Sequence, residues 1–175
     1  MEIRIYVANL AAYNAGFLVG EWIDLPLSDE ELREKIQSIL DAWNDGFSPS
    51  EEWAIHDYEA PFEIGEYESP YKVNEWAERL SNISEDEEVI NAIINHFSTV
   101  EEAIETIENG EYRIYNDCDD MADVAFQLWE ESGRLAEVEK VISPSYIDWE
   151  AIGRDMEIEG TFIKTNYNTF VEIIG

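Results

Sequence analysis

The side chains of this chain that could do chemistry are almost all carboxylates. Its 175 residues include 41 Asp and Glu against 10 Lys and Arg, which gives a formal net charge of −31 at pH 7. A pair of carboxylates can hydrolyse a glycosidic bond when the two groups face each other across a defined cleft. Acids recur along the whole chain, so no single pair stands out as such a couple. The residues therefore predict a protein that is not an enzyme.

One stretch has a spacing close to that of a calcium loop, residues 116–123, which read Asn-Asp-Cys-Asp-Asp-Met-Ala-Asp. Its glycine position is occupied by Ala122, and Leu128 stands where a calcium loop has a bidentate Glu. We interpret these acids instead as the first turn of a helix, where they complement the helix dipole. His56 and His96 lie far apart, and no zinc or phosphate-binding motif is present. The sequence predicts no metal and no cofactor.

The composition indicates a folded protein with its charge on the surface. The chain is 45% hydrophobic and 13% aromatic, whereas acidic disordered segments lack such residues. The negative charge argues against nucleic acid or an anionic membrane as a direct partner and favours a basic surface. Cys118 is the single cysteine, so no intrachain disulfide can form. With no signal sequence at the start and no apolar run of roughly 20 residues, we expect a cytoplasmic protein.

Two predicted helices, residues 84–97 and 99–108, show how the acids are positioned. Ser84 and Glu87 are spaced as a capping box, and Thr99 is a candidate cap for the second helix. Apolar residues recur at helical spacing in both segments, so each helix has one apolar face. No Lys or Arg occurs between Arg79 and Arg113. The opposite faces then carry the acids that we expect to bind a basic partner: Glu85, Asp86, Glu88, Glu101, Glu102, Glu105 and Glu108.

Periodicity along the whole chain predicts an α+β fold of three small domains in an elongated arrangement. Residues 1–62 form an α+β domain, with strands at 3–7, 17–25 and 53–58, a helix capped by Ser28 and a loop over 45–50. Residues 63–110 form a helical acidic domain, whose first helix is opened by Ser69-Pro70 and has Val73, Trp76, Ala77 and Leu80 on one face. Residues 111–175 form a second α+β domain, with a strand at 112–115, a helix from Asp117 to Gly133, a short helix over 143–152 and a hairpin over 161–174.

Acid-rich surfaces also occur in salt-adapted proteins. On that interpretation, the charge would serve only to keep the surface solvated. Two features oppose this interpretation. Isoleucine is frequent here, and the acids gather in stretches without bases instead of merely replacing lysine.

Several strings of this sequence resemble the ArdA-type antirestriction proteins, and they occur in the family's order nearly end to end. The strings include residues 5–10 (Ile-Tyr-Val-Ala-Asn-Leu), 54–59 (Ala-Ile-His-Asp-Tyr-Glu), 95–102 (Asn-His-Phe-Ser-Thr-Val-Glu-Glu) and 117–125 (Asp-Cys-Asp-Asp-Met-Ala-Asp-Val-Ala). The family's antirestriction segment corresponds to residues 129–138. The chain then reads Glu139-Lys140-Val141, which departs from the turn found in relatives.

The resemblance implies a dimeric DNA mimic that occupies the DNA-binding groove of type I restriction–modification enzymes and so protects incoming mobile DNA. The expected partners are the methyltransferase core of such an enzyme and a second copy of the chain. To the acids above we add Asp119, Asp120 and Asp123. Apolar groups around one short turn predict the dimer interface: Trp129, Leu135, Val138 and Val141. The alternative is an acidic, chaperone-like module that binds basic DNA-binding proteins in general.

Overall fold

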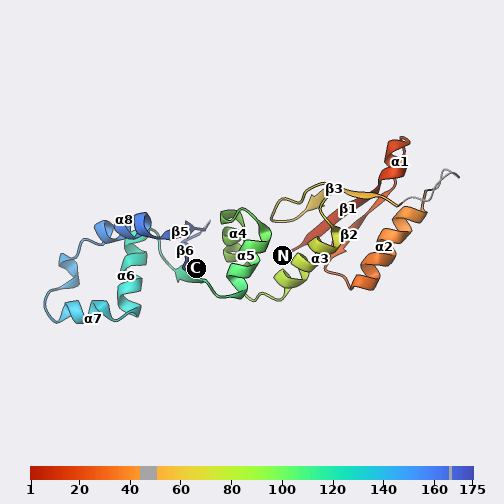
Figure 1. Ribbon diagram of the computed structural model, residues 1–175. Helices are drawn as coiled ribbons and strands as arrows, with labels where there is room; N and C mark the ends of the chain where they lie inside the picture. The colour runs from red at the N-terminus through yellow and green to blue at the C-terminus, as the bar shows by residue number, and fades with distance from the viewer. Residues whose placement is uncertain (44–50, 166) are drawn as a thin grey trace. The chain divides into compact units, whose positions relative to one another are not determined.

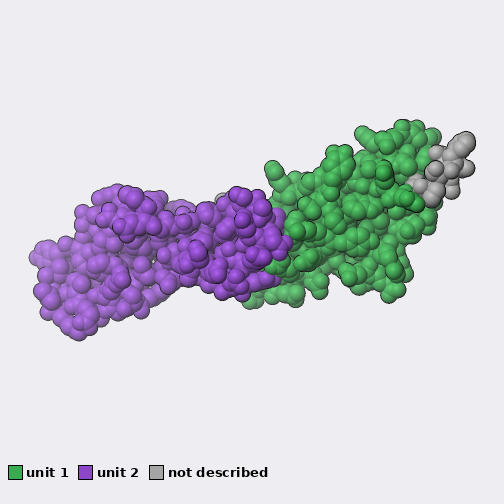
Figure 2. All heavy atoms as spheres, in the orientation of Figure 1, with its two compact units in different colours: residues 1–84 green, residues 85–175 purple. Residues whose placement is uncertain are grey.

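A computed structural model describes residues 1–43, 51–165 and 167–175 of the chain (Figure 1). The loop expected over 45–50 lies outside the described residues. Helices and strands are mixed, as the predicted α+β class requires, and they group into two compact units, residues 1–84 and 85–175 (Figure 2). The division into three domains and their elongated arrangement stay predictions. No helix in the described ranges is both long enough and apolar enough to cross a membrane.

The first unit is built on a three-stranded antiparallel sheet with the order β2-β1-β3. The strands are β1 (Ile3–Asn9), β2 (Gly20–Leu25) and β3 (Trp53–Glu59), so the strand expected from residue 17 begins later. Side chains of Ile3, Ile5 and Val7 are buried, while those between them are only half-buried. This alternation places one face of β1 on the core. Helix α1 (Leu10–Asn14) follows β1 directly.

Helix α2 (Asp29–Asp41) begins at the capping box that its sequence predicts. The Ser28 hydroxyl oxygen accepts the backbone N–H of Glu31, and the Glu31 carboxylate accepts the backbone N–H of Ser28. At the other end, the buried Asn9 side chain donates to the carbonyl oxygens of Ile39 and Leu40, each at 3.2 Å. Asn9 therefore satisfies carbonyls that the last turn of a helix leaves without partners.

Helix α3 (Pro70–Ser81) completes the first unit and buries the apolar face that its spacing predicts. Asn74 is buried in this face. Its amide group accepts the backbone N–H of Leu27 and donates to the Leu27 carbonyl, both at 2.8 Å. This pair of bonds fixes α3 to the segment that leads into α2.

The second unit opens with helices α4 (Glu87–His96) and α5 (Val100–Glu108). The capping box predicted at Ser84 is wrong, because Asp86 holds the N-cap position of α4. The Thr99 cap of α5 is confirmed. A three-stranded antiparallel sheet follows, with the order β4-β6-β5, formed by β4 (Tyr112–Asn116), β5 (Thr161–Lys164) and β6 (Thr169–Ile173). Helix α4 lies beside β5 and β6 (Figure 1).

The rest of the second unit consists of α6 (Met121–Glu131), α7 (Arg134–Glu139), the 3-10 helix η1 (Pro144–Tyr146) and α8 (Trp149–Glu159). Helices α6 and α8 approach so closely that a Cβ on Gly153 would lie 2.5 Å from the Met121 carbonyl oxygen. The bounds predicted for a single short helix over 143–152 are wrong, because the structure has two helices here, η1 and α8. Gly133 takes a left-handed φ of 75° and forms the start of α7.

Candidate interaction surface

Two of the three acids predicted at the start of α4 are half-buried and accept hydrogen bonds. Glu85 is half-buried, and its Oε1 accepts a 2.8 Å hydrogen bond from the hydroxyl of Tyr112 on β4. Burial, followed by the bond to Glu85, raises the pKa of Tyr112 to about 12. Glu88 is also half-buried and accepts the backbone N–H of Tyr167 at 2.9 Å. Asp86 is exposed at the N-cap position.

Helix α5 separates its charges from its apolar residues most cleanly. Ala103, Ile104 and Ile107 are buried, whereas Glu102, Glu105 and Glu108 are exposed and Glu101 is half-buried. The Thr99 hydroxyl donates to Glu102 at 3.1 Å while accepting the Glu102 backbone N–H at 3.3 Å, so Glu102 also stabilises the start of the helix. Glu105 and Glu108 therefore lie on the solvent side of the helix.

The three acids predicted near α6 are exposed, and two of them stabilise the helix start. Asp120 is the N-cap and accepts the backbone N–H groups of Ala122 and Asp123. Asp123 accepts the backbone N–H of Asp119 at 2.9 Å. The cap predicted at Asp117 is therefore wrong, and Asp117 instead takes a left-handed φ of 57°. Over the described part of the chain, no group of three or more His, Cys, Asp or Glu is placed to hold a metal ion.

Cys118 lies under this acidic turn with its thiol buried. The sulfur is 3.2 Å from the side-chain oxygen of Gln127. Burial raises the pKa of Cys118 to about 11, and the neighbouring aspartates, beginning with Asp123, add to the effect. The thiol is thus protonated at neutral pH and a poor nucleophile.

The four residues predicted for the dimer interface have different surroundings. Leu135 is only 6% exposed and belongs to the core of its own unit, whereas Val141 is 82% exposed. Val138 is half-buried. Trp129 is half-buried too, and its ring lies edge-on to that of Trp149, with 5.4 Å between centroids. Among these four, Val141 is therefore the side chain most available to a second molecule.

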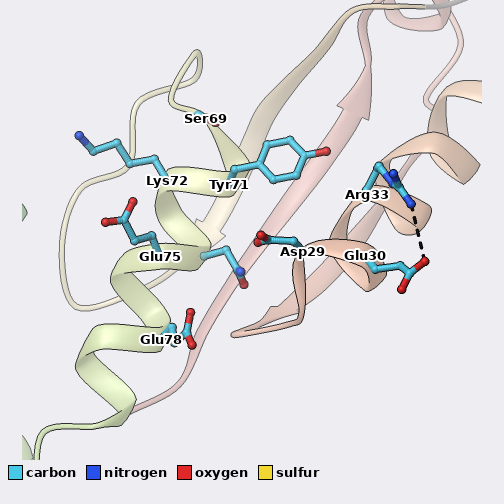
Figure 3. A pocket seen from close by; sticks show the side chains of 9 residues that line it. Asp29, Glu30, Arg33, Ser69, Tyr71, Lys72, Glu75 and Glu78 are labelled. Carbon is cyan, nitrogen blue, oxygen red and sulfur yellow. Dashed lines mark ion pairs between the residues drawn. The ribbon is translucent and has the colours of Figure 1, made fainter.

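A hollow of about 1050 Å³, which the sequence did not predict, lies in the first unit between α2 and α3 (Figure 3). Asp29 and Glu30 come from α2, and Glu75 and Glu78 come from α3, so acids line both sides. Arg33 also lies here and pairs with Glu30 at 3.7 Å. The acidic first turn of α2 and the spacing of Glu75 and Glu78 were signals that could have indicated this second acidic surface.

Several basic side chains are already paired with acids. Arg4 lies 3.5 Å from both Asp24 and Glu59. On the second sheet, Arg113 lies 3.3 Å from Glu172. The acids outnumber the bases about four to one, so such pairs leave most of the negative charge uncompensated. A high net charge of one sign attracts surfaces of the other sign over distances of about a Debye length.

The fold and its charged helix faces define a small, strongly acidic α+β protein. Residues 5–171 match the family described as antirestriction protein (ArdA). Because the match covers nearly the whole chain, this protein belongs to the ArdA antirestriction family. Membership gives it an antirestriction function, exerted on restriction enzymes, within a family of inhibitors. A search of curated proteins gave no match.

Proposed function

We propose that this protein inhibits type I restriction–modification enzymes by occupying the DNA-binding groove of their methyltransferase core. The observation that carries the proposal is helix α5, where Glu102, Glu105 and Glu108 are exposed on one face and Ala103, Ile104 and Ile107 are buried on the other. Charged and apolar side chains are thus separated onto opposite faces of a single helix. A basic groove built for phosphates is the natural partner of such a face.

The spacing of these carboxylates is comparable with that of DNA phosphates. An α-helix rises ~1.5 Å per residue, so acids three residues apart recur every ~4.5 Å along the axis. One strand of DNA presents a phosphate every ~3.4 Å of axis. The exposed carboxylates of α5 therefore approach phosphate-like density along one helix without any nucleotide.

A folded scaffold also lowers the entropic cost of binding. Glu85 is held by Tyr112, Glu88 by the backbone of Tyr167, and Asp120 by its capping bonds. Charges fixed before the encounter lose little conformational freedom when the partner arrives. The protein presents no base edges, so it should inhibit enzymes with different recognition sequences alike.

The proposed working unit is a homodimer joined through residues 129–141. Val141 is mostly exposed, and Ile142 and Tyr146 add exposed apolar surface close to it in sequence. A two-fold dimer would repeat the acidic surface, which suits an enzyme that reads a two-part target with two similar domains. We place this activity in the cytoplasm, where a mobile element's DNA would meet the host's restriction enzyme.

The salt dependence of inhibition tests charge mimicry. Between about 50 and 200 mM salt, the affinity for the enzyme should fall steeply and linearly on a double-logarithmic plot, as DNA affinity does. Binding of the enzyme's methyl-donor cofactor, measured at each salt concentration, is the control for an intact enzyme. An affinity that stays flat over this range would show that contacts other than charge dominate.

A further inference from the structure

A second hollow, of about 510 Å³, lies within the second unit where α4 faces the ends of β5 and β6. Glu88 and Asn91 line it from α4, three residues apart and so on the same face of the helix. Thr165 and Tyr167 line it from the opposite side. Thr165 is buried, whereas Tyr167 is 71% exposed and leaves its aromatic ring accessible.

The wall of this hollow contains an oxygen without a partner. Oδ1 of Asn91 is buried, yet within the described residues no group donates a hydrogen bond to it. A buried acceptor left in this state is costly, so it indicates a donor that comes from elsewhere. Glu88 accepts the Tyr167 backbone N–H through Oε1 only, and among the described residues its Oε2 has no donor. Glu88 and Asn91 therefore bring two side chains with acceptor oxygens to the same face of α4.

Among the described residues, neither of the two basic side chains that line the hollow forms an ion pair with Glu88. The Lys164 ammonium donates to the backbone carbonyl of Asp119 and lies 5.2 Å from the ring centroid of Phe170. His96 lies edge-on to Phe97, with 5.2 Å between ring centroids. An anion would meet the uncompensated charge of Glu88 and a chain of net charge −31. The charge of Glu88 and the net charge of the chain thus favour a cationic donor over an anion, although Lys164 lines the same hollow.

We propose that this hollow accepts the guanidinium group of an arginine from the DNA-binding surface of the restriction enzyme. A guanidinium has five N–H donors in a planar fork and no acceptor, which suits a carboxylate and an amide oxygen on the same face of one helix. Its flat face also stacks on aromatic rings, and Tyr167 supplies one. The choice of partner rests on the proposed function, and it adds a specific anchor to an otherwise diffuse attraction between charges.

The pocket is tested by titrating the protein with N-acetyl-arginine methylamide while following the backbone amide of Tyr167 by NMR. The citrulline analogue, which has the same shape without the charge, is the control ligand. We expect a saturable shift with the arginine compound only. Glu88→Gln should abolish it, and Asn91→Asp, which puts a carboxylate in place of the unpartnered oxygen, should tighten binding by up to about fivefold.

Matched variants separate the pocket from general charge. Glu105→Gln removes one charge from α5, and Ser38→Asp adds one to α2 in the other unit; both should leave the arginine titration unchanged. Equal shifts with citrulline, weaker binding by Asn91→Asp, or an effect of Glu105→Gln as large as that of Glu88→Gln would overturn the proposal. An amide spectrum that otherwise keeps its dispersion shows that each variant is folded.

The titration contains no restriction enzyme, so its failure can be told apart from failure of the proposed function. A wild-type protein that inhibits the enzyme without any arginine-specific shift contradicts the pocket alone. A protein with the shift that does not bind the enzyme contradicts the proposed partner.

Discussion

The hydroxyl of Tyr112 donates a 2.8 Å hydrogen bond to Oε1 of Glu85, and this bond connects strand β4 to the segment that starts helix α4. The two residues are 27 positions apart, and their bond holds an acid of the proposed binding surface against the second sheet. Glu85 therefore accepts a hydrogen bond that stabilises the fold and also contributes a negative charge to the proposed binding surface.

Removing this bond should lower stability in a pH-dependent way. Tyr112→Phe should cost about 0.5–1.5 kcal/mol of unfolding free energy at pH 8, the usual net value of one hydrogen bond. The pKa of Tyr112 is raised from 10.0 to about 12 in the folded protein, so its contribution is complete below about pH 10 and is lost as the pH rises through about 12.

Urea unfolding at pH 8, 10 and 11 checks this expectation. The stability of the wild type should decline over the alkaline range, and that of the variant should decline less. Tyr115 and Cys118, whose pKa values burial raises to about 12 and about 11, remain in both proteins and contribute to the residual slope. Equal stabilities and equal slopes would show that the bond to Glu85 contributes nothing.

The acids of α5 should act collectively. Glu105→Gln alone should change the affinity for the enzyme by less than about fivefold, since an exposed charge contact contributes about 0–1 kcal/mol. Replacing Glu101, Glu102, Glu105 and Glu108 together by Gln should weaken binding by about tenfold or more. Isothermal calorimetry of each variant against the methyltransferase core measures these effects.

Thermal unfolding is the control for the fourfold variant, whose reduced self-repulsion should largely preserve the fold. If Glu105→Gln alone abolished binding in a folded protein, one specific contact would replace the distributed surface proposed here.

The dimer interface is best tested at Val141. This side chain is 82% exposed, so Val141→Glu should leave the fold intact and dissociate a dimer joined through residues 129–141, because a charge would be buried without a partner. Leu135→Glu is a poorer test, since Leu135 is 6% exposed and its replacement would disturb the unit itself. Sedimentation velocity at micromolar concentration measures the state of assembly.

Ile158→Glu is the matched control, because Ile158 is 81% exposed and lies outside the segment 129–141. We expect this variant to remain dimeric. A monomeric wild type would contradict the dimer, and a Val141→Glu variant that stays dimeric would place the interface elsewhere.

The sequence predicted what local periodicity and capping chemistry determine. The Ser28 capping box, the Thr99 cap, the apolar faces of α3 and α5 and the terminal hairpin all depend on residues close together in the chain, and the structure confirms them. One failure arose where a distant residue intervenes. The cap expected at Ser84 moves to Asp86, and the neighbouring Glu85 is bonded to Tyr112.

The same limit applies to the binding surface. Which helix faces carry acids could be predicted from spacing, and the exposed carboxylates of α5 follow that pattern. The hollow beside α4 could not be predicted from spacing, because it depends on Tyr167. This residue is 79 positions beyond Glu88, and only the fold brings the two together. The direction of the Lys164 side chain could not be predicted either, because its ammonium group is held by a backbone carbonyl 45 positions away.

The most direct measurement is a competition titration on a purified type I methyltransferase core with a fluorescent duplex that carries its target. If the protein occupies the DNA groove, the apparent dissociation constant of the duplex should rise in proportion to the concentration of free inhibitor, without a plateau. A second enzyme with a different target sequence should give the same behaviour. A plateau, or a ternary complex that holds both duplex and inhibitor, would show that the protein acts at another site and would contradict DNA mimicry.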